Sequence, residues 1–328
     1  MEGKRVLITG ITGFVGSHLA DLLLKKGGME VYGLKRWRSS KENIRHILND
    51  IKLIDGDLRD LKSMNTVISM VQPHKIFHLA AQSFVPTSYD APIDTIYTNS
   101  IGTVNLLEAV RDGGTDPIIH VCSTSEVYGM VPEDKQPINE DTPFAPQNPY
   151  GLSKAFEDLT AYHYYKCYGM KTIITRAFSH TGPRRSDVFA ASSFAKQIAE
   201  IEAGKREPIV KVGNLQSVRT WMDVRDTVEA YWLLSEKGKP GDAYVVGGKS
   251  TKSIDEVLKL LISMSTKKDN IKIVQDYSLF RQADITLQIP DCTKLKRATG
   301  WEPKIPLETT LRDLLDYWRK KTANDTSF

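Results

Sequence analysis

The sequence predicts an α/β fold in which a doubly wound parallel sheet is accompanied by a smaller, interleaved α/β domain. Two observations support this prediction. Over the first 180 residues, short apolar runs alternate with helical patterns, as in chains built from β-α-β units. Beyond residue 180 the strands become shorter and the regular alternation is lost. We therefore expect a large domain over residues 1–180 plus about 218–248, and a smaller one over 181–217 and 249–328.

Each expected element follows from its local pattern. Strands are expected where a short apolar run ends in turn or polar residues, at 5–10, 30–36, 51–57, 75–81, 118–124 and 171–178. Helices are expected where apolar residues recur every three or four positions, at 17–28, 61–72, 98–114, 150–169, 192–205, 223–238, 252–265 and 294–321. Pro303 and Pro306 interrupt the last of these ranges.

Composition limits the class of function. With 328 residues, 41% of them hydrophobic and 26% charged, the chain can bury a full core. A net charge of +4 without a long basic run gives no support for nucleic-acid binding. Three widely separated cysteines without CxxC spacing predict reduced thiols and neither a disulfide framework nor a metal site. No apolar h-region or membrane-length stretch occurs, so we expect a cytoplasmic protein without a membrane partner.

The first candidate site is the glycine-rich stretch "GITGFVG". It places Gly10, Gly13 and Gly16 directly after the first expected strand and at the start of a helix. A helix N-terminus offers unpaired N–H groups and a partial positive charge, and glycine lets the backbone approach a ligand closely. The stretch therefore predicts a Rossmann-type site for the pyrophosphate of a dinucleotide. A glycine-rich turn that binds nothing is the alternative.

The end of the second strand indicates which dinucleotide. NAD sites usually carry an Asp or Glu there, bonded to the ribose 2′-hydroxyl. This chain has "GLKRWRSS" instead, in which Arg36, Arg38 and Ser39 would accept a 2′-phosphate through charge-assisted hydrogen bonds. The pattern favours NADP over NAD, although arginines that are simply solvated would give the same spacing.

The candidate chemistry lies in "STSEVYG" and "YGLSK". Tyr150 and Lys154 are four residues apart, hence on one face of a helix. A nearby ammonium favours the phenolate, which makes Tyr150 a plausible general base in hydride transfer. Thr124 and Glu126 lie at the end of an expected strand about two dozen residues upstream and add a hydroxyl and a carboxylate. A salt bridge at the strand end is the alternative role for Glu126.

The glycine turn, "LAAQS", "STSEVYG" and "YGLSK" together resemble the extended short-chain dehydrogenase/reductase family, over nearly the whole chain. Within that family, "KRWRSS", "HTGPRR" and "VGNLQSVRTWMDVRD" are similar to members that act on GDP-linked sugars. The resemblance implies a lyase that dehydrates GDP-mannose, or a close GDP-sugar, to the 4-keto-6-deoxy sugar by internal hydride transfer through NADP. It also implies a homodimer or homotetramer.

Other activities stay open on the sequence. The second half also resembles a 4-reductase that consumes NADPH, in "FAKQIAEIEAG" and "ATGWEPKIPLETTL". Both enzymes share the Tyr–Lys pair, whereas Thr124 and Arg185 favour the dehydratase. An epimerase, or a scaffold that keeps the fold without the chemistry, is a further alternative. In the dehydratase, Tyr150 would deprotonate the 4-hydroxyl, Thr124 would bond the 4-oxygen, and Glu126 would take the carbon 5 proton and help expel the 6-hydroxyl.

The resemblance also implies two binding sets. The expected cofactor contacts are Gly10, Thr12, Gly13, Phe14, Val15, Gly16, Arg36, Arg38, Ser39, Asp57, Leu58, Leu79, Ala80, Ala81, Ser83, Tyr150, Lys154, His180 and Arg185. The expected substrate contacts are Ser83, Thr124, Ser125, Ser179, Lys196, Val212, Asn214, Arg219, Arg281 and Asp284. Two departures from the family pattern are Ser179, where Asn is usual, and the tryptophan within "RWRSS".

Overall fold

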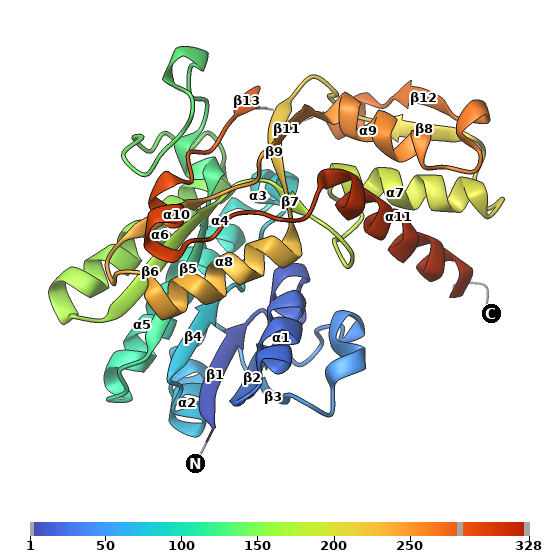
Figure 1. Ribbon diagram of the computed structural model, residues 1–328. Helices are drawn as coiled ribbons and strands as arrows, with labels where there is room; N and C mark the ends of the chain where they lie inside the picture. Colours follow the sequence, from blue (N-terminus) through green and yellow to red (C-terminus); the bar gives the residue numbers. More distant parts are fainter. Residues whose placement is uncertain (1–2, 281–284, 325–328) are drawn as a thin grey trace.

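The computed structural model describes residues 3–280 and 285–324, and a parallel seven-stranded sheet forms its largest layer (Figure 1). All six neighbouring strand pairs in this sheet run parallel. In spatial order the strands are β10 (Ala243–Val246), β6 (Lys171–Ala177), β5 (Ile118–Thr124), β4 (Lys75–His78), β1 (Lys4–Thr9), β2 (Met29–Lys35) and β3 (Lys52–Asp55). The predicted doubly wound parallel sheet is thus confirmed.

The order of the strands reverses beside β1. From β1 the chain moves outward through β2 to β3, then crosses back to β4 on the other side of β1. Successive connections leave these two strands in opposite directions, so the loops separate there and leave a crevice at the strands' carboxyl ends. Thr9 and His78 lie opposite each other at that edge, where β1 and β4 end.

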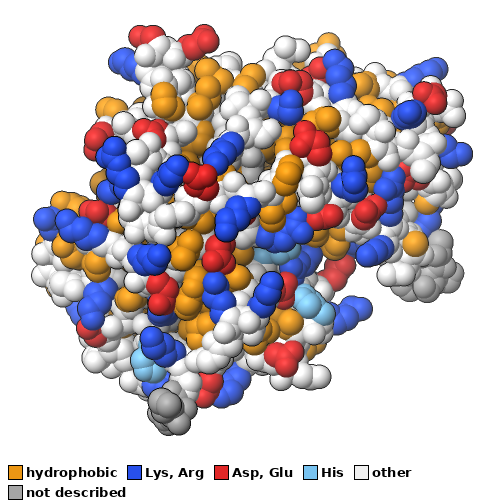
Figure 2. Space-filling view, viewed as in Figure 1, with side chains coloured by type: hydrophobic (Ala, Val, Ile, Leu, Met, Phe, Trp, Pro, Cys, Tyr) orange, Lys and Arg blue, Asp and Glu red, His pale blue; other side chains and the backbone are white. Residues whose placement is uncertain are grey.

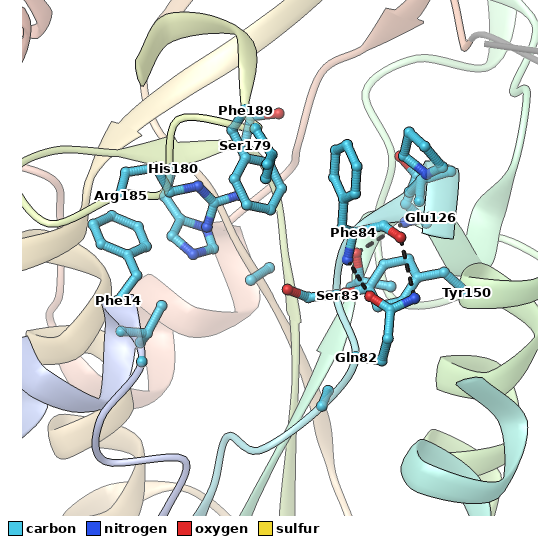
Figure 3. Close-up of a pocket in the computed structure, with 18 of the residues that line it drawn as sticks. Phe14, Gln82, Ser83, Phe84, Glu126, Tyr150, Ser179, His180, Arg185 and Phe189 are labelled. Atoms are coloured by element: carbon cyan, nitrogen blue, oxygen red, sulfur yellow. Dashed lines mark hydrogen bonds between the residues drawn. The ribbon is translucent and has the colours of Figure 1, made fainter. Parts of the chain in front are cut away.

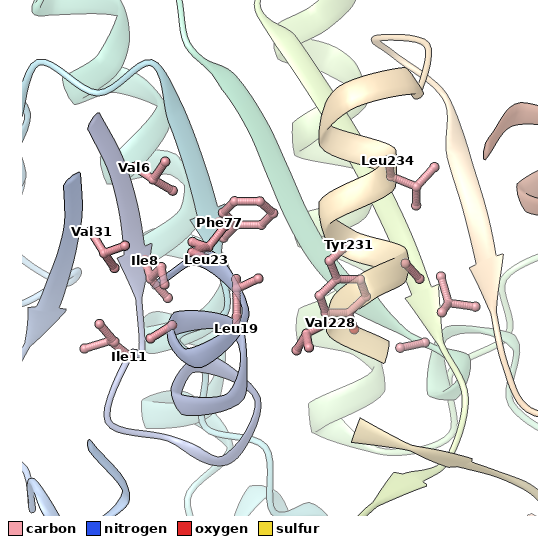
Figure 4. Packing of buried hydrophobic residues seen from close by; sticks show 14 of the residues in the cluster. Val6, Ile8, Ile11, Leu19, Leu23, Val31, Phe77, Val228, Tyr231 and Leu234 are labelled. Carbon is pink, nitrogen blue, oxygen red and sulfur yellow. The ribbon is translucent and has the colours of Figure 1, made fainter. Parts of the chain in front are cut away.

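Helices cover both faces of the sheet because residues along each strand alternate in direction. Val6 and Ile8 of β1 pack in one cluster with α1 (Phe14–Lys26) and α8 (Val224–Lys237), as Figure 4 shows. Leu7, between them, belongs to the cluster on the opposite face. The helices of that face are α2 (Leu61–Val71), α5 (Gly102–Asp112) and α6 (Pro149–Tyr168).

One helix differs from its prediction. Instead of a continuous helix over 98–114, the chain forms α4 (Pro92–Ile96), a π-helical turn (Tyr97–Ile101) and then α5. The turn places the Asn99 side chain where its oxygen accepts from the Gln82 backbone N–H at 2.7 Å and its amide donates to the Gln82 carbonyl at 2.9 Å. Periodicity alone does not distinguish such a π turn from regular helix, since it adds only one residue to a turn.

The second lobe lies beyond the carboxyl edge of the large sheet (Figure 1). Its core is formed by buried residues such as Phe194, Ile198, Leu258 and Leu314. Its elements are α7 (Ala190–Glu202), β8 (Ile209–Val212), α9 (Ile254–Ser263), β12 (Lys272–Gln275) and α11 (Leu307–Asn324). A capping box of Ser253 and Glu256 begins α9, which fits the start expected from the sequence.

A small sheet joins the two lobes. In it β9 (Val218–Asp223) pairs with β11 (Ser250–Ser253), β13 (Leu287–Gln288) and β7 (His180–Thr181). The helix α10 (Thr293–Thr299) packs on α8 and β10, where Leu295 is buried, rather than in the second lobe. The domain boundaries expected from the sequence remain our proposal for how the chain divides.

The molecular surface has no single dominant charge on the face shown in Figure 2. Lys and Arg side chains are interspersed there with Asp and Glu. Among the described residues, no helix combines the length and the apolar character that a membrane crossing requires.

Candidate active site

A cavity of about 1070 Å³ lies at the carboxyl ends of the central strands and is lined by residues of both lobes (Figure 3). In open α/β sheets, ligands bind in the crevice beside the point where the strand order reverses. Pockets for drug-sized ligands are usually about 300–1,000 Å³. The cavity therefore has room for a dinucleotide cofactor and a part of a second ligand.

The glycine turn forms one end of this cavity. Gly10 has a φ of +74° and lies so close to Ala80 that a Cβ would come within 2.9 Å of its backbone. A Cβ on Gly16 would come within 2.2 Å of the Gly10 carbonyl oxygen. No acidic residue occupies the first turn of α1, so its N-terminal N–H groups keep their positive potential.

Only some of the residues predicted to bind the 2′-phosphate line the cavity. Arg36 and Ser39 line it, and the Ser39 N–H donates to the Arg36 carbonyl at 2.9 Å. Arg38 does not line the cavity; its guanidinium lies 4.5 Å from the ring centre of the exposed Trp37. The tryptophan in "RWRSS" thus gives the second arginine a partner outside the site. Lys35 forms an ion pair with Asp55 at the ends of β2 and β3.

The loop after β4 is held against the glycine turn. The Thr9 hydroxyl accepts hydrogen bonds from the Leu79 and Ala80 N–H groups, both at 3.1 Å. Asn99 fixes the next residue, Gln82, and also donates to the Ser153 hydroxyl at 2.9 Å. This chain of bonds joins the loop that contains Ser83 to the helix α6, so both lie together on one wall of the cavity (Figure 3).

The turn Thr124–Glu126, which we call the catalytic turn after the role expected for it from the sequence, begins where β5 ends. Thr124 is the last strand residue, and its hydroxyl accepts the Glu126 N–H at 3.3 Å, as an N-cap of the following 3₁₀ turn. The Glu126 carboxylate accepts from the Asn148 side-chain amide at 2.8 Å. Asn148 also caps α6, since its oxygen accepts the Gly151 N–H at 2.7 Å. One asparagine therefore sets both the carboxylate and the start of the helix that contains Tyr150.

Tyr150 and Lys154 line the cavity beside this turn, on the first turns of α6. The Lys154 ammonium donates to both oxygens of Glu157, each at 2.8 Å, and Glu157 is 0% exposed. Burial raises the pKa of Glu157 to about 7, while the Glu157 carboxylate helps to raise the pKa of Lys154. Burial also raises the pKa of the Tyr150 phenol, and the Lys154 ammonium and the Thr124 hydroxyl act against that rise.

The opposite wall is aromatic and cationic (Figure 3). The rings of Phe14 and His180 stack with centres 6.0 Å apart. The Arg185 guanidinium lies 4.9 Å from the ring centre of Phe14 and 3.5 Å from that of Phe189. Among the described residues, no carboxylate lies within ion-pair distance of Arg185. Burial lowers its pKa to about 10 and lowers that of His180 to about 4.

The glycine turn and the Arg185 guanidinium both fit a nicotinamide dinucleotide. A cradle that only glycine can form lies at the positive end of α1, which suits a pyrophosphate. A desolvated guanidinium without a carboxylate partner gains most from a ligand that brings negative charge. In the described part of the chain no group of three or more His, Cys, Asp or Glu side chains is arranged to hold a metal ion.

Most of the residues predicted from the sequence line this cavity. Those that do are Gly10, Thr12, Gly13, Phe14, Val15, Gly16, Arg36, Ser39, Asp57, Leu58, Leu79, Ala80, Ala81, Ser83, Thr124, Ser125, Glu126, Tyr150, Lys154, Ser179, His180, Arg185, Asn214 and Arg219. Lining the cavity places a residue near a ligand but does not assign its role. Arg281 and Asp284 lie outside the described residues.

Two predicted substrate contacts, like Arg38, lie away from the cavity. Lys196 projects from α7 to Asp187, with 2.7 Å between nitrogen and oxygen, and its ammonium lies 5.5 Å from the ring centre of Trp318. Val212 is 1% exposed and packs in the core of the second lobe. Alternation along β8 explains the second case, because Val212 points inward while Lys211, before it, lines the cavity.

Sequence reasoning missed several residues of the site, among them Asn148, Glu157, Phe189 and Gln288. Glu157 could have been found, because a position three residues after Lys154 shares its helix face. Asn148 before Pro149 signals a helix start but not a bond to Glu126. Phe189 and Gln288 have no local signal, since only the fold brings them to the cavity.

Comparisons with known proteins found similar sequences and similar structures. A model of the family described as GDP-mannose 4,6 dehydratase matches residues 7–314. The GDP-mannose 4,6-dehydratase of Yersinia enterocolitica is 33% identical to this chain over an alignment of 350 residues. The alignment covers 95% of this chain and 93% of that protein.

Two solved structures show the same fold. RMD from Pseudomonas aeruginosa, complexed with NADPH, has a TM-score of 0.83 at 30% identity and covers 97% of this chain and 99% of its own. The dTDP-glucose 4,6-dehydratase of Bacillus anthracis, in complex with NAD, has a TM-score of 0.83 at 26% identity, with 98% of each chain covered. Both nicotinamide dinucleotides therefore occur among proteins similar to this one.

Proposed function

The chain belongs to the GDP-mannose 4,6-dehydratase family of extended short-chain dehydrogenases/reductases, and from this premise we propose that it is a hydro-lyase that converts GDP-mannose, or a close GDP-sugar, to the 4-keto-6-deoxy sugar. One observation supports this most strongly: the phenol of Tyr150, the hydroxyl of Thr124 and the carboxylate of Glu126 line the same cavity. A base for a hydroxyl and a second base for a carbon acid are the two groups that a 4,6-dehydration needs.

Tyr150 is the proposed base for the sugar 4-hydroxyl. Lys154 favours the phenolate electrostatically, and Thr124 supplies a hydroxyl that can bond the same sugar oxygen. Because Glu157 holds the Lys154 ammonium at two oxygens, the charge that acts on Tyr150 stays in one place. The phenol then receives the proton as the 4-keto group forms.

Glu126 is the proposed base for carbon 5. A 4-keto group acidifies the proton on the neighbouring carbon, and the carboxylate can take this proton and give it to the departing 6-hydroxyl, which leaves as water. Asn148 orients the carboxylate through its 2.8 Å bond and leaves the second oxygen available for the sugar. One carboxyl group thus acts first as base and then as acid. When the hydride returns at carbon 6, carbon 5 takes up a proton from water and Tyr150 releases the proton of the 4-hydroxyl to water, so the net change is the loss of one water molecule.

The proposed cofactor is NADP rather than NAD. The glycine turn would hold the pyrophosphate, Arg36 and Ser39 the 2′-phosphate, and Lys154 and Arg185 would contribute positive charge along the cavity. When bound, the oxidised nicotinamide would accept the hydride from carbon 4, return it at carbon 6 and place a positive charge near the phenol. No carboxylate follows β2 at the position that NAD sites commonly use.

The GDP part of the substrate is proposed to lie toward the second lobe. Arg219 and Asn214 line the cavity, as do Lys211 and Phe280. A guanidinium such as that of Arg219 suits a diphosphate because it can bond two oxygens at once. Ser179, Ser83 and Ser125 would contact the sugar from the other side, in the arrangement that the family resemblance implies.

We further propose that the protein forms a homodimer through α6. Leu152, Phe156 and Leu159 are 53%, 46% and 58% exposed on one face of this helix, and Tyr97 is 48% exposed on the neighbouring π turn. Several large apolar side chains on one helical face commonly mark an interface between protein chains. Light scattering of the wild type and of Phe156→Glu would test this assignment.

The experiment that tests the activity uses pure protein, GDP-mannose and NADP⁺ at a small fraction of the substrate concentration. Complete conversion to a 4-keto-6-deoxy sugar, followed by NMR, is expected, because the cofactor is regenerated in each turnover. Consumption of one NADPH for each 4-keto sugar reduced would instead identify a 4-reductase. Glu126→Gln serves as the matched control and should abolish the loss of water.

A further inference from the structure

One side chain from the far end of the sequence contacts the catalytic turn. Gln288 lies on β13 and is 1% exposed. Its amide nitrogen donates to the Ser125 carbonyl oxygen at 3.2 Å, and its amide oxygen accepts from the Ser125 hydroxyl at 3.0 Å. A single amide therefore binds both polar groups of the residue between Thr124 and Glu126. The Ser125 hydroxyl, expected from the resemblance to contact substrate, donates its hydrogen to Gln288 in the free protein and keeps its oxygen as an acceptor.

The two neighbours of Ser125 depend on this contact to different degrees. Thr124 is still part of β5, where it lies opposite Ala177 of β6. Glu126 lies past the end of the strand, in a 3₁₀ turn. The Ser125 carbonyl bound by Gln288 belongs to the peptide that joins Ser125 to Glu126. The contact therefore restrains the backbone of Glu126 more than that of Thr124.

The other end of Gln288 is fixed to the small sheet. Its backbone pairs with Arg219 of β9, and its carbonyl accepts the Thr220 hydroxyl at 3.3 Å. Arg219 is the residue proposed above to hold the substrate diphosphate. Gln288 thus links Arg219, through its backbone, to the turn that contains Glu126, the proposed base for carbon 5.

We propose that Gln288 is a positioning residue that sets Glu126 at a fixed place relative to the nucleotide-binding part of the cavity. This inference rests on the proposed dehydration. Elimination requires the carboxylate close to carbon 5, and that carbon's position follows from where the diphosphate is held. A misplacement of about 1 Å can reduce the rate of a positioned reaction by roughly 100-fold. Oxidation at carbon 4 depends on Tyr150 and Thr124, whose own supports do not include Gln288.

The test replaces Gln288 by Met, which keeps the length of the side chain and removes both hydrogen bonds. We expect kcat for dehydration to fall roughly 10- to 100-fold, while KM for GDP-mannose stays within about twofold. Rapid quench of a single turnover, with the sugar identified by mass, should show a 4-keto sugar that still has its 6-hydroxyl. Ser125→Ala, which loses only one of the bonds, should give a smaller effect in the same direction.

Gln136→Met is the matched control. Gln136 donates to the carbonyl of Leu287 on β13 at 3.3 Å and accepts from the N–H of Ile289, the residue after that strand, at 3.0 Å. No hydrogen bond between described residues joins Gln136 to the catalytic turn. The variant Gln136→Met should lower the unfolding temperature of the free protein as much as Gln288→Met does, but it should not accumulate the oxidised sugar. GDP affinity, measured by calorimetry, should be unchanged in both variants.

Two results would overturn the inference. If Gln136→Met and Gln288→Met accumulate the oxidised sugar equally, general anchoring of β13 explains the effect. If Gln288→Met and Ser125→Ala both dehydrate at the wild-type rate, Gln288 does not position Glu126. Failure of the proposed function is distinct, because the wild type itself would then leave GDP-mannose unchanged.

Discussion

Two cations, the buried Lys154 and the half-buried Arg185, face the same cavity from opposite walls, and they differ in what balances their charge. The ammonium of Lys154 lies 2.8 Å from each oxygen of the buried Glu157 carboxylate. Arg185 lies between the rings of Phe14 and Phe189, with no carboxylate among the described residues within ion-pair distance. The charge of Lys154 is therefore balanced in the free protein, whereas a bound anionic ligand would balance the charge of Arg185.

The difference teaches how the chain divides catalysis from binding. A desolvated charge without a partner reduces stability, so it persists where a ligand repays its cost. On the Lys154 side the protein fixes the charge that acts on Tyr150 before any ligand arrives. Variants on the two walls should therefore change different quantities: catalysis and stability on one, ligand affinity on the other.

The largest expected effect is that of Tyr150→Phe. Loss of the phenol removes the base for the 4-hydroxyl, and general bases contribute about 10²- to 10⁴-fold to rates, so we expect kcat to fall by roughly 1,000-fold. GDP binding by calorimetry should be unchanged, since the ring and its packing remain. A variant with substantial residual turnover would show that the catalytic wall has another base.

Lys154→Met should reduce the stability of the free protein, and more strongly at higher pH. Burial raises the pKa of Glu157 to about 7 from an ordinary value of 4.5, and the Lys154 ammonium opposes that rise, so the variant's pKa is higher still. The folded state then keeps a proton that the unfolded chain has released, and stability falls as pH rises above 4.5. The wild-type carboxyl group also keeps its proton up to about pH 7, so the extra loss in the variant begins near that pH. We expect it to be about 1 kcal/mol at pH 8 and little at pH 5, measured by urea unfolding.

The double variant Lys154→Met, Glu157→Gln is the control for this pair. It contains no buried carboxyl group at this place, so its stability relative to the wild type should vary less with pH than that of Lys154→Met. If the single variant were equally destabilised at pH 5 and pH 8, a lost packing contact rather than an uncompensated carboxylate would be the cause.

Arg185→Met should change ligand affinity and should not reduce the stability of the free protein. Removing a desolvated charge without a carboxylate partner should leave the free protein as stable as the wild type, or more stable by about 1 kcal/mol. NADP⁺ affinity should fall about 100-fold, because the ligand loses its charged contact on this wall. A marked loss of stability together with unchanged NADP⁺ affinity would show that Arg185 is structural.

The smallest expected effect is that of Arg36→Ala at the exposed end of the cavity. Water screens a partly solvated guanidinium, so NADP⁺ affinity should fall only about tenfold. NAD⁺ affinity, measured in the same calorimetric titration, should be unchanged because NAD⁺ has no 2′-phosphate. Arg38→Ala is the matched control, since that side chain stacks on Trp37 outside the cavity. Equal losses for NADP⁺ and NAD⁺ would contradict the assignment of Arg36.

The sequence was sufficient where one local pattern determines the outcome. Alternating strands and helices predicted the doubly wound sheet, and four-residue spacing placed Tyr150 and Lys154 together on the cavity wall. Gly10 and Gly16 were predictable because only glycine permits those close backbone approaches.

The rest depends on contacts between distant segments. Gln288 and Ser125 are 163 positions apart, and nothing near either residue indicates the pair. Lys196 and Val212 were expected from family resemblance alone, and the fold turns one toward Asp187 and the other into the core. The π turn at Asn99 was missed because a helical pattern does not show which side chain will be bonded to a neighbouring loop.

The central claim is that hydrogen moves from carbon 4 to carbon 6 within one sugar while the two walls hold it in place. The most direct measurement uses GDP-mannose with deuterium at carbon 4, unlabelled NADP⁺ in small amount, and NMR of the product. The account predicts a 4-keto-6-deoxy sugar with the deuterium at carbon 6. Deuterium that appears in the nicotinamide pool and not at carbon 6, or a sugar that keeps its 6-hydroxyl, would contradict it.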